Sequence, residues 1–182
     1  MSEMNTWSID PTHSHIEFAI RHLMISTVKG RFSAFTGTVE LDPDDLTTAK
    51  IDVAIQAASI DTHTTDRDNH LRSADFFDVA THPALTYASR RVEQRGDQFL
   101  VIGDLTIRGV TREVALAVTL EGTNRDPWGN DRMAFRATAG INRSDFGLTW
   151  NKALEAGGVL VGEEVKISIE VQLVPAPAEA GV

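Results

Sequence analysis

The chain of 182 residues is long enough for one domain with a filled core but short for two, and we predict a single domain. It contains no cysteine, which excludes disulfides, thiolate metal sites and a cysteine nucleophile. The 17 basic and 26 acidic residues leave a net charge of −9, which repels nucleic acid phosphates, so nucleic acid is not an expected partner.

Residues 1–6 form a polar, acidic N-terminal extension that leads directly into strand-like sequence at Trp7. This extension lacks a basic region followed by an apolar core, which is the pattern of a secretory signal. Charges interrupt every apolar run well before the roughly 18 to 20 residues that a membrane-spanning helix requires. We therefore expect a cytoplasmic protein without stable membrane insertion.

Alternation of apolar and polar residues with period two dominates the chain and is typical of strands with one buried face. In residues 15–22, Phe18 and Ile20 face one side while Glu17 and Arg21 face the other. Similar alternation occurs at 32–41, 51–55, 85–87, 99–107, 114–120, 133–141 and 165–173. About eight strands suffice to close a barrel that holds its own side chains or one small ligand.

Turn sequences separate these strands at 41–45, 95–97, 108–111 and 126–130. Short turns join antiparallel strands without helical crossovers, so we expect neither a parallel sheet nor its phosphate-binding loops. Gly30, Gly37 and Gly103 lie inside strands, where we expect bends or a close backbone approach. The Pro-rich residues 175–182 are expected to form a flexible tail.

Two segments do not have strand character. Residues 64–77 begin with a Thr or Asp that can cap a helix, and they predict a short helix of about three turns. Residues 151–162 include 152–156, which we expect to form one helical turn that ends at Gly157 and Gly158. Because both segments are longer than hairpin loops, we expect them at a barrel mouth, as lids or binding loops.

The six histidines are the candidate metal or haem ligands. His13 and His15 form an H-x-H pair that would share one face of a strand, as a zinc site can use. The same pair also fits a turn before a strand, with the imidazoles bonded to nearby backbone. His63 and His70 fit the polar face of the predicted helix. A haem- or metal-binding barrel that uses His13, His15 or His70 therefore remains an alternative.

Catalytic patterns are weaker. Ser14 lies beside two histidines but lacks a nucleophile elbow. The carboxylates at 61, 66, 68, 75 and 78 have the chemistry of a general acid and base, although helix-start and surface charge explain their clustering more simply. An enzyme that acts on a small lipophilic substrate through Arg67, Asp68 or His70 is the other alternative.

The strands mix bulky apolar residues with small ones. In a barrel of about eight strands, small inward-facing side chains leave a lumen where large ones would meet at the axis. An apolar cavity of a few hundred Å³ is therefore expected. The small residues are Ala19, Gly30, Ala34, Ala57, Gly103, Ala137 and Ala139.

A series of motifs resembles the YceI-like family, whose members are also described as polyisoprenoid-binding, lipocalin-like proteins. The matching segments run in order from about residue 7 to about residue 174, and together they are far more specific than any single segment. They are Trp7-Ser-Ile-Asp-Pro-Thr-His-Ser-His-Ile-Glu-Phe18, Val28-Lys-Gly-Arg-Phe32, Ser59-Ile-Asp-Thr62, Arg67-Asp-Asn-His-Leu-Arg-Ser-Ala-Asp-Phe-Phe-Asp78, His82-Pro83, Gly103-Asp-Leu-Thr-Ile-Arg-Gly-Val-Thr111 and Ile141-Asn-Arg-Ser-Asp-Phe-Gly147.

This resemblance implies an all-β fold: an extended, eight-stranded, antiparallel lipocalin-like barrel over residues 7–174, with the short helix near one mouth. It implies a binding protein rather than an enzyme. The implied ligand is a long apolar amphiphile such as an isoprenoid quinone, a polyprenyl lipid or a fatty amide, held in the barrel and carried or sequestered. Many family members are periplasmic.

The expected ligand-binding residues are apolar side chains that face the lumen or lie in the predicted helix. We expect no catalytic residues, no metal and no cofactor. A homodimer is a possible assembly. Residues 64–78 are predicted to move or fray to admit the lipid. The predicted lining is Phe18, Ile20, Phe32, Val53, Ile55, Leu71, Phe76, Phe77, Tyr87, Leu105, Phe135, Phe146 and Trp150.

Overall fold

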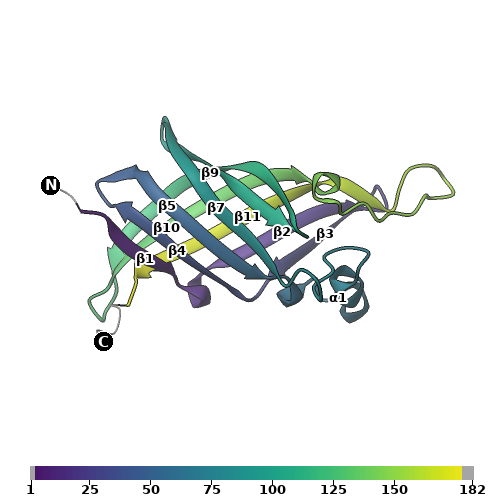
Figure 1. Cartoon of the computed structure of the whole chain (residues 1–182), viewed down its shortest axis with the longest axis horizontal. Coiled ribbons are helices and arrows are strands. Elements are labelled where there is room, and N and C mark those ends of the chain that lie inside the picture. The colour runs from purple at the N-terminus through teal and green to yellow at the C-terminus, as the bar shows by residue number, and fades with distance from the viewer. Residues whose placement is uncertain (1–2, 178–182) are drawn as a thin grey trace.

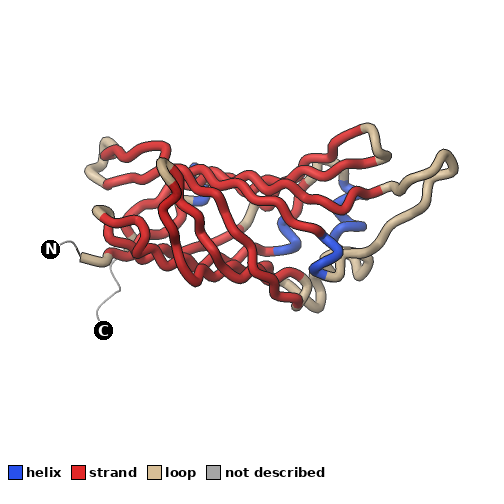
Figure 2. The backbone as a smooth tube through the Cα atoms, turned by 90° about the horizontal axis from the view of Figure 1, so that it is seen from above, coloured by secondary structure: helices blue, strands red, loops and turns tan. Residues whose placement is uncertain are grey.

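The structure of the chain is a computed structural model that describes residues 3–177. Residues 1–2 of the predicted extension and 178–182 of the predicted tail lie outside the described residues. The chain forms an elongated antiparallel sheet (Figures 1 and 2). The strands are β1 (Asn5–Ile9), β2 (His15–His22), β3 (Ser26–Phe32), β4 (Phe35–Asp42), β5 (Asp45–Gln56), β6 (Ile60–Asp61), β7 (Ala84–Arg95), β8 (Gln98–Ile107), β9 (Val110–Arg125), β10 (Asp131–Asn142) and β11 (Val161–Pro175).

Eight strand positions close the sheet into a barrel, which confirms the predicted all-β, eight-stranded antiparallel fold. Three positions each contain two consecutive strands, namely β1 with β2, β3 with β4, and β5 with β6. In each pair, both members hydrogen bond to the same neighbouring position, as β1 does with β4 and β2 with β3. The barrel closes where β11 pairs with both β1 and β2.

A short 3-10 helix, η1 (Pro11–His13), interrupts the first strand position. Asp10 caps it by accepting a hydrogen bond from the Thr12 amide at 3.0 Å. Arg132 Nη1 donates to the same carboxylate at 2.7 Å and so ties η1 to β10. Burial alone raises the Asp10 pKa, but hydrogen bonds from Thr12, Arg132 and His13 outweigh it and hold the pKa well below its usual range.

The predicted helix exists but is shorter than the predicted 64–77. Helix α1 spans Thr65–Arg72 and ends because Ser73 has extended backbone, with ψ 172°. The Ser73 hydroxyl donates to the His70 carbonyl at 2.6 Å. The following residues turn back, so that the Phe77 amide donates to Leu71 O at 2.9 Å. The chain after α1 therefore folds over the last turn of the helix.

The helical turn predicted for 152–156 is absent, and that prediction is wrong. Residues 151–160 form a projecting loop, hereafter the long loop, closed by a bridge between Ala153 and Val159. Gly157 and Gly158 have φ values of 92° and 86°, which reverse the chain direction instead of ending a helix. The Leu160 amide donates to Lys152 O at 2.9 Å, so the two arms of the loop run side by side.

The barrel wall has a seam between β9 and β10. Their pairing ends at Thr138 with Ala117, and beyond this point β10 continues beside β11 while β9 continues beside β8. The 3-10 helix η3 (Arg143–Phe146) follows β10 directly and contacts β9, β10 and β11. Phe146 is almost completely buried in the core.

Two strand glycines allow aromatic rings to lie flat against the sheet. A Cβ at Gly30 would lie 2.4 Å from Phe18 Cζ, and one at Gly103 would lie 2.7 Å from Tyr87 Cζ. The expected close approach at these glycines is therefore present, made by the Phe18 ring at Gly30 and by the Tyr87 ring and the Ala88 carbonyl oxygen at Gly103. No helix among residues 3–177 has the length and apolar character needed to cross a membrane.

Candidate ligand-binding cavity

A long apolar cavity of about 380 Å³ runs inside the barrel. Side chains from all eight strand positions and from α1 line it. Strand β11 illustrates the pattern, because alternate residues face the interior along most of its length. Those residues are Val165, Ile167, Ile169, Val171 and Leu173.

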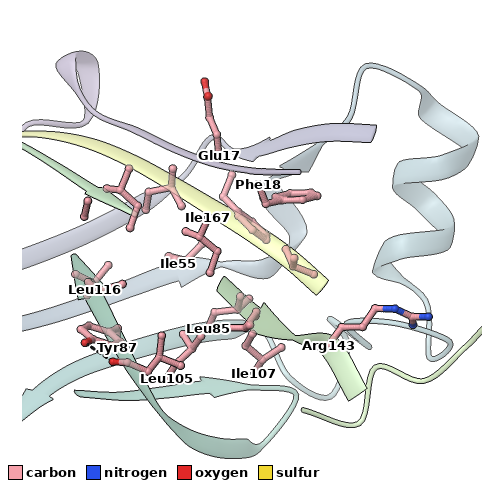
Figure 3. Close-up of a pocket in the computed structure, with 18 of the residues that line it drawn as sticks. Glu17, Phe18, Ile55, Leu85, Tyr87, Leu105, Ile107, Leu116, Arg143 and Ile167 are labelled. Atoms are coloured by element: carbon pink, nitrogen blue, oxygen red, sulfur yellow. Dashed lines mark hydrogen bonds between the residues drawn. The ribbon is translucent and has the colours of Figure 1, made fainter. Parts of the chain in front are cut away.

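Twelve of the thirteen residues named from the sequence line this cavity. Phe146 is the exception, because its side chain packs at the β9–β10 seam and not in the lumen. Figure 3 shows several of the lining side chains, among them Phe18, Ile55 and Leu105. The twelve are Phe18, Ile20, Phe32, Val53, Ile55, Leu71, Phe76, Phe77, Tyr87, Leu105, Phe135 and Trp150.

One end of the cavity, which we call the closed end, is filled by a separate apolar cluster near the chain termini. Trp7, Val39, Leu41, Met133 and Leu173 are buried there against one another. Val39, Leu41 and Leu173 also contact the cavity, so the cluster forms its floor. The hydrogen-bonded pairs of β1 with β4 and of β10 with β11 bring these residues together.

The opposite end, which we call the mouth, carries α1 and the long loop (Figure 1). Most polar residues that line the cavity belong to this end, whereas the remaining lining is apolar. The sequence analysis did not identify these residues as lining, because their positions depend on tertiary contacts and on the β2–β3 hairpin. Alternation within a single strand carries no information about such contacts. The polar lining residues are Arg21, His22, Thr62, Arg67, His70 and Arg143, together with Glu17, whose carboxylate points away from the cavity (Figure 3).

The polar groups of α1 are largely occupied with holding the helix in place. The buried Asp68 carboxylate accepts hydrogen bonds from the Thr62 amide at 2.9 Å and from its hydroxyl at 2.5 Å. Arg67 donates to Thr62 Oγ1 at 2.8 Å and to Thr62 O at 2.7 Å. Thr62 therefore joins the end of β6 to α1.

Aromatic rings connect α1 and the segment after it to Trp150, which directly precedes the long loop. The His70 ring meets Trp150 edge-on with centroids 4.6 Å apart, and Phe76 lies 5.4 Å from Trp150. His70 Nε2 lies 2.8 Å from Asp75 Oδ2, which fixes the ring. Phe77 in turn packs edge-on against Phe32 inside the barrel, at 5.9 Å.

Arg143 organises the base of the long loop. Its buried guanidinium donates to the carbonyls of Leu148 at 2.5 Å, Trp150 at 2.9 Å and Gly162 at 2.7 Å. Burial lowers its pKa, and the carboxylate of Glu163 opposes that shift. Figure 3 shows Arg143 at the α1 end of the cavity, where its hydrogen bonds fix the backbone that carries Trp150.

Tyr87 contributes an apolar wall despite its hydroxyl. The hydroxyl donates to Val114 O at 3.0 Å and is buried. Burial, together with the negative charges of Asp104 and Glu113, raises the pKa of the phenol above its usual value. Tyr87 therefore stays neutral, with its polar atom turned to the barrel wall.

The histidine pair does not form the arrangement that a strand would give it. His13 lies in η1, and its Nδ1 is 2.8 Å from Asp10 Oδ2, whereas His15 begins β2. The interpretation that the two imidazoles share a strand face is therefore wrong. Within residues 3–177 no three His, Cys, Asp or Glu side chains gather closely enough to hold a metal ion.

An elongated eight-stranded barrel around an apolar cavity is the architecture of lipocalin-like binding proteins. The YceI-like domain model matches residues 7–173, and the chain belongs to the YceI-like family. The UPF0312 protein SERP2314 of Staphylococcus epidermidis is 40% identical over 164 residues, which cover 90% of this chain and 94% of that protein.

Two solved structures share the fold. Burkholderia cenocepacia BcnA matches with a TM-score of 0.79 and 23% identity, over 90% of this chain and 98% of BcnA. A polyisoprenoid binding domain from Saccharophagus degradans, implicated in plant cell wall breakdown, matches with a TM-score of 0.67 and 17% identity, over 96% of this chain and all of that domain (100%). At these identities the similarity establishes the fold alone.

Proposed function

We propose that this protein binds a long apolar amphiphile, such as an isoprenoid quinone, a polyprenyl lipid or a fatty amide, and carries or sequesters it. The observation that carries the proposal is the apolar cavity itself, which has an apolar floor and polar lining concentrated at one end. The polyisoprenoid binding named for the Saccharophagus degradans domain supports the same ligand class.

The polarity of the cavity also orients the ligand. An apolar chain gains most by lying toward the closed end, because the cavity lining there is apolar. The polar head then lies near Thr62 and Arg67, whose side chains line the mouth. Burying about 400 Å² of chain at roughly 25 cal/mol/Å² provides on the order of 10 kcal/mol before association and ordering costs.

Catalysis is not part of the proposal. Arg67 and Asp68, two of the three residues named for the enzyme alternative, hydrogen bond to Thr62, and Arg143 bonds to backbone carbonyls. These contacts give each group a structural role. The cytoplasmic location and the homodimer stay predictions.

The ligand is identified by extracting the purified protein with organic solvent and analysing the extract by mass spectrometry. We expect one stoichiometric amphiphile with a long hydrocarbon chain. A protein that contains no apolar molecule and takes up none when mixed with polyprenol or ubiquinone would contradict the proposal.

A cavity-filling variant tests where the ligand lies. Ala137 on β10 is buried and faces the cavity, whereas its neighbour Thr138 is exposed on the outer face. We expect Ala137→Phe to remove most of the bound ligand, because the new ring occupies the lumen. Thr138→Phe on the same strand is the matched control and should keep the ligand; equal ligand content in both variants would place it outside the barrel.

The access route is proposed to pass beneath α1 and the residues that follow it. Phe76 and Phe77 stand between the mouth and the lumen, so replacing both with Asp puts charge on the route. The double variant should lose ligand on purification while circular dichroism still reports a folded barrel. Unchanged ligand content in the folded double variant would exclude this route.

A further inference from the structure

Four apolar side chains are exposed on the two tips that project at the mouth. Leu23, Met24 and Ile25 form the β2–β3 turn, with exposed fractions of 41%, 58% and 80%, and Val159 on the long loop is 38% exposed. We call these four residues the mouth patch. Figures 1 and 2 show the long loop extending beyond the barrel at the end that carries α1.

The two tips form one surface. The Leu23 amide donates to Leu160 O at 2.8 Å, which joins the β2–β3 turn to the long loop. Met24 also lies against the long loop, since a Cβ on Gly158 would be 3.2 Å from Met24 Cγ. The patch is continuous with the mouth, because Arg21 and Leu160 beside it line the cavity.

The backbone of the turn is unfavourable for the residues that it carries. Leu23 and Met24 have φ values of 54° and 64°, in the left-handed region that favours Gly, Asn and Asp. Large apolar residues add strain there and, being exposed, contribute little to the core. The fold alone would favour polar turn residues, so the apolar side chains point to a role outside the barrel.

The β2–β3 hairpin itself is basic, whereas the long loop beside it carries Lys152 and Glu155. Residues 21–31 contain Arg21, Lys29 and Arg31 and no carboxylate, within a chain of net charge −9. Arg21 is held at the turn by hydrogen bonds from its guanidinium to Thr27 Oγ1 at 3.1 Å and Met24 O at 3.2 Å. Arg31 is paired with Asp61 at 3.6 Å. Arg21 and Lys29 are the other exposed cations of the hairpin, and Lys152 is an exposed cation of the long loop, where its carbonyl accepts a hydrogen bond from the Leu160 amide.

We propose that the mouth patch inserts into the surface of an anionic phospholipid bilayer and holds the mouth of the cavity against it. Apolar side chains flanked by basic ones are the combination that binds such an interface. A stable protein partner fits less well, since four side chains offer far less than the roughly 800 Å² per partner of a specific interface. The inference rests on the proposed function, because contact with the bilayer brings a membrane amphiphile to the mouth.

The test measures flotation of the purified full chain with vesicles of phosphatidylcholine and phosphatidylglycerol, and with vesicles of phosphatidylcholine alone. The test variant is Ile25→Asp. The matched control is Trp128→Asp, because Trp128 is equally exposed, at 81%, but lies in the β9–β10 turn, whose Asp126 is joined through Arg132 to Asp10 near the closed end. Thermal unfolding of both variants verifies that each is folded.

We expect the wild-type chain to float with the anionic vesicles more than with the neutral ones, and Ile25→Asp to reduce binding about tenfold or more. Trp128→Asp should bind as the wild type does. Ile25→Trp, which keeps an apolar side chain, should bind at least as well and show a blue shift of its fluorescence with vesicles. Equal losses in Ile25→Asp and Trp128→Asp, no loss in either, or an oligomer that only Ile25→Asp dissociates would each overturn the inference.

Ligand content, measured by mass spectrometry on the same preparations, separates the two proposals. A chain that contains an apolar ligand but shows no patch-dependent vesicle binding retains the proposed function and loses this inference. A chain that binds vesicles through the patch but neither contains nor takes up an apolar ligand loses the proposed function alone.

Discussion

The two ends of the barrel are built from the same strands but differ in which side chains are buried and which are exposed. At the closed end, Trp7, Leu41 and Leu173 pack into an apolar floor. At the mouth, polar side chains enter the lining and apolar ones are exposed on the projecting turns. The first arrangement maximises burial, and the second keeps apolar surface in water. The two ends therefore differ in which kind of side chain meets solvent and which meets the cavity.

The largest expected effect compares one leucine from each end. Leu173→Ala at the floor removes an almost fully buried side chain and should lower the free energy of unfolding by about 2 to 5 kcal/mol. Leu71→Ala, in partly buried α1, should lower the free energy of unfolding less and reduce the ligand content more. Chemical denaturation and ligand content of both variants test the comparison, which fails if the two variants lose stability and ligand alike.

Acid should weaken the closed end through Asp10. Its folded pKa is depressed, so the stabilisation is fully present above the ordinary Asp pKa of about 3.9 and is lost as the pH falls below it. Asp10→Asn should cost about 1.5 to 3 kcal/mol at neutral pH, since it weakens charge-assisted hydrogen bonds to Arg132 and Thr12. The free-energy difference between variant and wild type should shrink below about pH 4; a difference independent of pH would argue against it.

A methyl group added to the mouth half of the barrel should also destabilise it. At Gly30 the new Cβ meets the Phe18 ring at 2.4 Å, so Gly30→Ala should cost about 1 to 3 kcal/mol and displace that ring from the cavity wall. Gly122→Ala is the control, because no atom lies within 4 Å of the added Cβ. Equal thermal stability of the two variants would show that the strand gives way easily at Gly30.

The smallest effect should be a gain in stability. Leu23→Asn places a residue that tolerates the left-handed region at φ 54° and should stabilise the fold by about 0.5 to 1 kcal/mol. The same change removes an apolar side chain from the mouth patch and should weaken vesicle binding. A gain in stability together with weaker vesicle binding would support the contrast between the two ends. A loss of stability would mean that Leu23 supports the fold.

Period-two alternation predicted strands with one buried face, and the resemblance to the YceI-like family supplied the eight-stranded barrel. Most residues named as lining face the cavity. Alternation did not predict that the Phe146 side chain lies outside the lumen, because its position depends on where the pairing of β9 with β10 ends. The end of α1 at Arg72 and the shape of the long loop were also missed. Arg143 holds that loop through carbonyls distant in sequence, and local patterns carry no information about such contacts.

The apolar floor has a consequence for selectivity. Under the proposed function, a lumen that is blind at one end limits the length of the tail it holds, because the tail can advance only until it meets Leu41 and Leu173. Tails shorter than the lumen leave unfilled space, and longer ones hold the head group outside the mouth. Affinity across a homologous series of amphiphiles should therefore rise with chain length to a maximum and then level off or fall.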